Sequence, residues 1–179
     1  MTIGYLAQFE PVMRLAIAEA AGIAQQGGPA ARSSFPEKAA NERTQAARYA
    51  DDVPVGAVVL DPDGNVIARA GNRREADADP TAHAEIVAIR AAGRERVSWR
   101  LAGCTLVVTL EPCTMCAGAI LNARISRLVY GAPDERAGAA GSVWDLLHDP
   151  RLGPEVEVIG GVLEPECAAL LTEFFGQLR

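Results

Sequence analysis

Residues 105–123, TLVVTLEPCTMCAGAILNA, decide the fold because they place a buried strand directly before a helix. The first six residues are apolar or β-branched, which predicts a strand over 105–110. Pro112 suits the first turn of a helix, which is predicted over 113–123. A strand that passes straight into a helix is a building unit of α/β domains.

The segments on either side continue this alternation. Thr81 and Ser142 are expected to cap two further helices. The chain is therefore predicted to form a single α/β domain over residues 1–179, with three α/β/α layers and a central mixed five-stranded sheet. The other strands are predicted over 55–60, 65–70, 127–131 and 156–162, and the other helices over 8–25, 82–93, 142–147 and 164–178.

The composition is that of a globular protein. The 179 residues are 49% hydrophobic and 22% charged, which excludes a disordered or fibrous chain. No apolar run approaches the roughly 18 residues of a membrane span. Residues 1–8 show no signal peptide, so a cytoplasmic location is expected. The net charge of -6 excludes a polycationic coat for nucleic acid but allows a local basic patch.

Two cysteines and a histidine indicate a metal site. Four cysteines in a reducing compartment favour metal or core roles over disulfides. Cys113 and Cys116 lie three residues apart at a helix start, where both thiols can reach one ion and where their pKa is lowered. His83 lies at the start of another predicted helix. One imidazole and two thiolates suit zinc, and three protein ligands leave a fourth position for water, as in catalytic zinc sites.

Glu85 follows His83 by two residues, so its carboxylate can lie beside the metal-bound water without binding the metal. It would accept the proton of that water and pass it on. The alternative is a structural zinc with four protein ligands, the last from Cys104 or Cys167. Both cysteines are more simply interpreted as buried core residues. His148 is expected at a helix end facing solvent.

Several motifs together resemble the bacterial tRNA-specific adenosine deaminases, within the cytidine and deoxycytidylate deaminase superfamily. The combination of His-x-Glu with Pro-Cys-x-x-Cys is an established signature of zinc nucleobase deaminases. The resemblance covers residues 13 to about 22 and then 53–179, which is most of the chain. The motifs are VPVGAV (53–58), GNR (71–73), DPTAHAE (79–85), TLEPCTMCAGA (109–119), GAAGS (138–142) and ECAALL with the following phenylalanine pair (166–175).

This resemblance implies a cytidine-deaminase-like fold and an RNA-editing hydrolase. The expected reaction is hydrolytic deamination of the wobble adenosine to inosine in a tRNA anticodon loop, of the tRNA-Arg class. One zinc ion per subunit would be held by His83, Cys113 and Cys116, with Glu85 as the catalytic residue. A homodimer with tRNA as its partner is expected, and neither DNA nor a membrane.

The resemblance also assigns substrate contacts. Asn72 matches the position that hydrogen-bonds the flipped nucleoside. Asp134 lies in the loop that lines the entrance to the pocket, near the neighbouring nucleotide. Phe174 and Phe175 resemble the C-terminal pair near the anticodon stem-loop; spacing alone would place at least one of them in the core.

Two other functions share parts of this pattern. A zinc deaminase of a free nucleobase or nucleotide, such as guanine or cytosine, would need every zinc residue. A non-catalytic, zinc-stabilised RNA-binding module would not need Glu85.

Residues 29–50 depart from the family pattern. They are predicted to form a flexible insertion between the first helix and the first strand. This mildly basic insertion is most simply a disordered surface loop, and the alternative is an extra contact to RNA phosphates.

Overall fold

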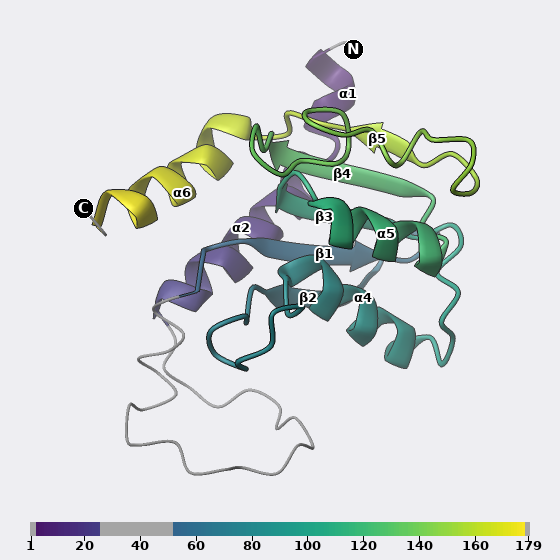
Figure 1. Cartoon of the computed structure of the whole chain (residues 1–179), viewed down its shortest axis with the longest axis horizontal. Coiled ribbons are helices and arrows are strands. Elements are labelled where there is room, and N and C mark those ends of the chain that lie inside the picture. The colour runs from purple at the N-terminus through teal and green to yellow at the C-terminus, as the bar shows by residue number, and fades with distance from the viewer. Residues whose placement is uncertain (1–2, 26–51, 178–179) are drawn as a thin grey trace.

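The computed structural model describes residues 3–25 and 52–177, so the predicted insertion over 29–50 lies outside the described residues. None of the helices in these ranges is long and apolar enough to cross a membrane. The helices are α1 (Ile3–Ala7), α2 (Glu10–Gln25), α4 (Ala84–Glu95), α5 (Thr114–Ala123) and α6 (Glu164–Gln177), and the strands are β1 (Gly56–Leu60), β2 (Val66–Gly71), β3 (Thr105–Leu110), β4 (Arg127–Ala132) and β5 (Glu157–Ile159) (Figure 1).

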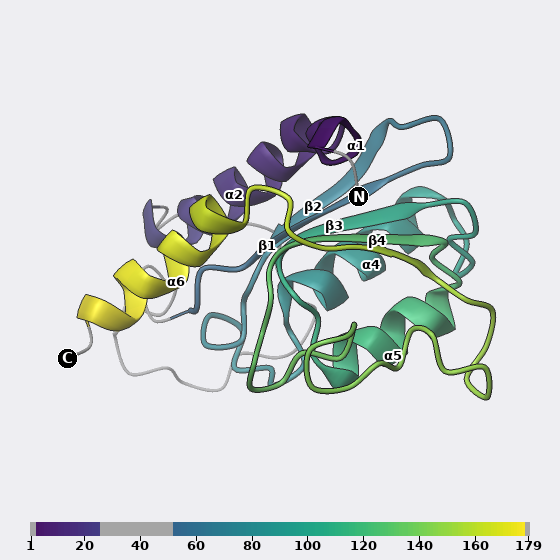
Figure 2. The same ribbon diagram turned by 90° about the horizontal axis from the view of Figure 1, so that it is seen from above.

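The five strands form one mixed sheet in the order β2-β1-β3-β4-β5, which confirms the predicted architecture. Strand β1 pairs antiparallel with both β2 and β3. Strands β3, β4 and β5 run parallel. Helices α2 and α6 cover one face of the sheet, and α4 and α5 cover the other (Figure 2). The α4–α5 face carries the residues predicted to bind the metal.

Alternation along the central strands explains why the sheet is covered on both faces. Val59 and Val108 pack in the core cluster that includes buried residues of α4 and α5. Val58 and Val107 pack in the second cluster, which includes buried residues of α2. Successive side chains of a strand point to opposite faces, so a continuously apolar strand needs a helix on each side.

The start of α4 differs from the prediction. Thr81 is not its cap, because the Thr81 hydroxyl and N–H both donate to the Asp79 carboxylate, at 2.7 and 2.8 Å. Helix α4 begins at Ala84, and His83 occupies the N-cap position with an extended backbone. Because of this local turn around Asp79, the helix begins two residues later than predicted, and His83 lies at its N-terminal end.

The helix predicted over 142–147 is absent, and these residues are irregular, with turns and an isolated bridge from Asp145 to Ala140. The Ser142 N–H and hydroxyl donate to the Glu111 carboxylate rather than capping a helix. The N–H groups of Val143 and Trp144 both donate to the Gly138 carbonyl, at 3.2 and 3.0 Å. His148 is exposed as expected, but it follows a turn and its Nδ1 lies 2.8 Å from Asp145 Oδ1. Helix α1 was not predicted, since five residues are too few to show a period.

Close packing of α2 on β1 makes Gly56 a sensitive position. A Cβ atom at Gly56 would lie 2.0 Å from the Ala16 carbonyl oxygen and 2.7 Å from the Ala20 nitrogen. We expect Gly56→Ala to lower the free energy of unfolding by about 3 kcal/mol, because the helix backbone must move away. Urea denaturation followed by circular dichroism measures this change.

Gly118 is the matched control, because a Cβ atom there would have nothing within 4 Å. Gly118→Ala replaces a glycine inside α5 and should leave the protein as stable or raise the free energy of unfolding by up to about 1 kcal/mol. Equal stability of the two variants would contradict the close approach of α2 to β1.

Candidate active site

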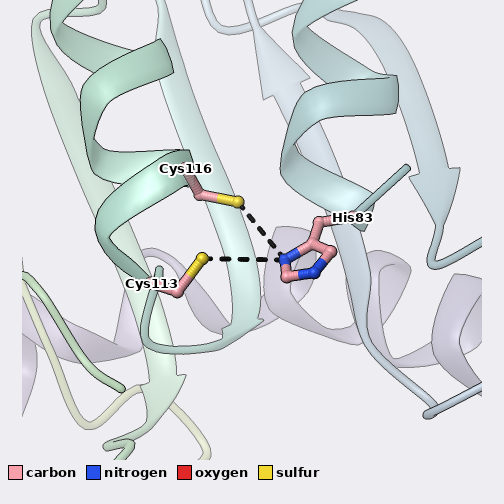
Figure 3. A group of neighbouring side chains, drawn as sticks. All are labelled: His83, Cys113 and Cys116. Atoms are coloured by element: carbon pink, nitrogen blue, oxygen red, sulfur yellow. Dashed lines mark hydrogen bonds between the residues drawn. The ribbon is translucent and has the colours of Figure 1, made fainter. Parts of the chain in front are cut away.

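The starts of α4 and α5 bring the predicted metal ligands together. The Cys113 and Cys116 sulfurs lie 3.7 and 3.6 Å from His83 Nδ1. Figure 3 shows both sulfurs pointing toward this nitrogen. One ligand atom from each of the three residues lies within 4.8 Å of the other two. His83 and Cys113 are the N-cap residues of their helices, yet neither side chain caps its helix by a hydrogen bond. All three side chains are therefore available to a shared ion.

The donor chemistry fits zinc. One imidazole nitrogen and two sulfurs form a common zinc ligand set. The pKa of Cys113 is lowered to about 3, chiefly because the Cys116 thiol donates a hydrogen bond to it and His83 lies beside it. The same sharing raises the pKa of Cys116. A metal replaces that shared proton when it binds.

Within residues 3–25 and 52–177, no fourth histidine, cysteine or carboxylate completes the group. Cys104 and Cys167 are fully buried in the two core clusters, as the sequence indicated. Three protein ligands with one open corner are the arrangement of catalytic rather than structural zinc sites. The geometry therefore favours the catalytic interpretation.

Glu85 lies in the first turn of α4 and lines the same pocket as His83 and Cys113. Its side chain has almost no contact with solvent, since the residue is only 4% exposed. Burial raises the pKa of the Glu85 carboxyl. A carboxyl with a raised pKa beside a metal site is suited to accept and return a proton near neutral pH.

The pocket has a volume of about 180 Å³. It brings together five side chains that the sequence predicted for the site, one of which is Asp134 from the loop after β4. Arg74 lies on its wall and is exposed. The remaining lining residues are mostly apolar. The full set is Val53, Val55, Asn72, Arg74, His83, Ala84, Glu85, Leu110, Glu111, Cys113, Asp134 and Ala137.

Asn72 offers the pocket an unused hydrogen-bond acceptor. Its Nδ2 donates to the Val53 carbonyl at 3.2 Å, which orients the amide. Its Oδ1 is buried and is the one such side-chain atom without a partner in the described part of the chain. Buried polar atoms are nearly always paired, so this atom indicates a ligand donor at that place.

Asp134 lines the pocket, but one of its carboxylate oxygens is already occupied. Asp134 Oδ1 accepts hydrogen bonds from the N–H groups of Arg136 at 2.9 Å and Ala137 at 3.2 Å. These bonds shape a turn that places Ala137 at the pocket as well.

Sequence reasoning missed Glu111, which is 2% exposed and lines the pocket. Its carboxylate accepts hydrogen bonds from Asp134, Ala140 and Ser142. The signal was an acidic residue directly after a strand of apolar and β-branched residues, where a solvated side chain is not expected. Its partners lie more than 20 residues away in the sequence, so the pattern could not name them.

The structure does not bring the phenylalanine pair to the pocket. Phe174 and Phe175 lie on α6, which packs on the face of the sheet opposite α4 and α5 (Figure 2). Their rings contact each other edge to face, with centroids 5.3 Å apart. Phe175 is 50% exposed, and Phe174 is partly buried. Contact of this pair with RNA stays a prediction.

The comparisons with known proteins agree with the fold and the site. Residues 29–132 match the family described as "Cytidine and deoxycytidylate deaminase zinc-binding region". The five-stranded sheet and the His-Cys-Cys group thus belong to a zinc-binding deaminase of that superfamily.

Individual relatives identify the family within that superfamily. The tRNA-specific adenosine deaminase of Haemophilus influenzae is 46% identical over 151 residues, covering 83% of this chain and 87% of that protein. The enzyme of the same name from Bacillus subtilis is 44% identical over 142 residues, covering 79% and 88%. A solved structure from studies of A-to-I editing by tRNA:A34 deaminases aligns with a TM-score of 0.72 at 41% identity, covering 89% and 97%. The chain belongs to the tRNA-specific adenosine deaminase family.

Proposed function

We propose that the protein deaminates the wobble adenosine of a tRNA anticodon loop to inosine, in tRNA of the Arg class. The observation that carries the proposal is that Glu85 and Asn72, whose Oδ1 is buried and unpaired, line the same pocket as the metal ligands His83 and Cys113. Family membership supports adenosine in tRNA as the substrate. A base must leave the anticodon stack to enter such a pocket.

The reaction adds the oxygen of water at C6 of adenine and releases the amino nitrogen as ammonia. Zinc, when held by His83, Cys113 and Cys116, supplies the Lewis acidity that makes water reactive at neutral pH. Glu85 would take a proton from the water and deliver it to N1 of the adenine. It would then take the second proton, from the hydroxyl now on C6, and pass it to the leaving amino group, so the carboxyl ends the cycle as it began.

The mouth of the pocket supports recognition of a nucleic acid despite the net charge of -6. Arg74 lines the pocket and its side chain is half exposed, where it pairs with Glu75 Oε1 at 3.3 Å. It would exchange this partner for a phosphate beside the flipped base. Asp134 and Ala137 form part of the wall that the neighbouring nucleotide would meet. We propose in addition that the protein is a cytoplasmic homodimer with tRNA as its partner, because the family resemblance favours this assembly, this location and this partner.

Replacing Asn72 with alanine tests its role in holding the nucleoside. The variant loses the buried acceptor, so we expect kcat/KM for the tRNA to fall by about 10-fold to 100-fold. Steady-state kinetics on a wobble-adenosine tRNA measure the change. Asn65→Ala is the control, because Asn65 is exposed in the turn between β1 and β2. A normal kcat/KM for Asn72→Ala would exclude substrate contact by this amide.

The experiment that tests the proposed function compares substrates. The purified protein is incubated with a tRNA-Arg transcript that carries adenosine at the wobble position, with the same transcript carrying guanosine there, and with free adenine, guanine and cytosine. Inosine in the first transcript alone supports the proposal. Ammonia from a free base alone would identify a nucleobase deaminase, and RNA binding without any product would identify a non-catalytic module.

A further inference from the structure

Glu111 is a buried carboxylate that the proposed chemistry does not use. It follows β3 and is separated from the first cysteine ligand only by Pro112. Oε1 accepts the N–H groups of Ala140 and Ser142, at 2.9 and 3.1 Å. Oε2 accepts the Asp134 N–H at 3.0 Å and also the Ser142 hydroxyl. Each oxygen thus has two donors.

This set of bonds requires a group that only accepts. An ionised carboxylate has about four acceptor positions and no donor, and all four are used here. A glutamine at the same place would turn an amide N–H group toward two donors that need an acceptor. The donor on Ala140 is buried and that on Asp134 is partly buried. Leaving such donors unpaired is costly, so the position demands a carboxylate on chemical rather than steric grounds.

All four donors belong to one segment, residues 134–142, which we name the wall loop. The wall loop carries Asp134 and Ala137 into the lining of the pocket. It also lies against the start of α5, since the Ala139 N–H donates to the Pro112 carbonyl at 2.8 Å. A Cβ atom on Gly138 would lie 2.5 Å from the Glu111 carboxyl carbon, so the loop backbone passes directly over this side chain.

We propose that Glu111 is a positioning residue that holds the wall loop in place as the substrate-binding wall of the pocket. It acts on substrate binding through Asp134 and Ala137, and it takes no part in proton transfer or metal binding. The proposal rests on the proposed function, because the substrate it serves is the flipped adenosine and its neighbouring nucleotide.

Glu111→Gln tests the proposal, because it keeps the volume and one oxygen. We expect KM for the wobble-adenosine tRNA to rise by about tenfold or more. The value of kcat should stay within about threefold, since the reacting groups are untouched. Zinc content should remain one per chain. Amide hydrogen exchange should accelerate within the wall loop and stay unchanged in α4.

The control is Asp61→Asn. Asp61 also accepts two backbone N–H groups, from Asp63 and Asn65, but it lies in the turn at the opposite end of β1 from the pocket. This variant should leave KM and exchange of the wall loop unchanged. Ser142→Ala removes one of the four donors and should raise KM less. It serves as the main test if Glu111→Gln does not fold.

The double variant adds a further check. If Glu111 and Ser142 act on KM through the same loop, their combined effect is smaller than the product of the two single effects. A fall in kcat at constant KM, loss of zinc, or unchanged exchange in the wall loop would overturn the proposal. An inactive wild-type protein would refute the proposed function alone, because the exchange measurement does not depend on turnover.

Discussion

Replacing Glu85 with alanine is expected to lower kcat for tRNA deamination by about 1,000-fold or more, while the protein keeps its zinc. The residue is 4% exposed and lies in the pocket beside the ligands, but it is not one of the three grouped donors. Loss of a general acid–base typically costs about 100-fold to 10,000-fold. Without the carboxylate, N1 protonation and ammonia release lose their proton donor. Single-turnover assays with inosine detection measure the rate, and metal analysis measures the zinc.

Two further variants separate the loss of proton transfer from a loss of packing. Glu85→Gln keeps the shape of the side chain and should be nearly as inactive, because an amide cannot carry the proton. Glu95→Ala changes an exposed glutamate at the other end of α4 and should leave kcat unchanged. A Glu85→Ala variant that retains normal turnover would show that another group moves the proton.

Replacing Cys116 with alanine is expected to abolish zinc binding and deamination together. The side chain is fully buried and its sulfur lies 3.6 Å from His83 Nδ1. Removing one of three protein ligands leaves an incomplete site, and binding of a metal to a folded site contributes directly to folding free energy. The melting temperature should therefore fall as well. Metal analysis, deamination assays and thermal denaturation measure the three effects.

Cys104→Ala is the matched control for this variant. Cys104 is equally buried but packs in the core away from the grouped ligands. We expect this variant to lose about 1 kcal/mol of stability and to retain its zinc and its activity. Treating the wild-type protein with a chelator should reproduce the Cys116→Ala result. Full zinc content in Cys116→Ala would show that the ligand set is wrong.

Four of the five strands were predicted to within one residue at each end. The strand predicted over 156–162 was too long, because β5 covers only Glu157–Ile159. The strand over 105–110 matches β3 at both ends, and the helix over 113–123 matches α5 to within one residue. The grouping of His83 with the cysteine pair was also predictable, because zinc chemistry restricts the ligand types and their spacing.

Other features depend on contacts that local patterns do not contain. Ser142 has the residue type of a helix cap, yet a buried carboxylate 31 residues earlier takes its hydrogen bonds. Thr81 likewise lies where a cap is common, but its hydroxyl and N–H donate to the Asp79 carboxylate instead. The position of α6 in the sequence was predicted, but only the packed structure shows that this helix, which carries Phe174, covers the face of the sheet opposite α4 and α5 (Figure 2).

The order of the site along the chain has a consequence for biosynthesis. The last metal ligand, Cys116, is translated before the wall loop over 134–142. The wall loop binds to the carboxylate of Glu111, which is also translated before it. A chain that ended between these two points would hold every metal ligand but lack the loop that forms the substrate-facing wall of the pocket. The ligands of the ion are therefore complete earlier in synthesis than the contacts that meet the nucleotide.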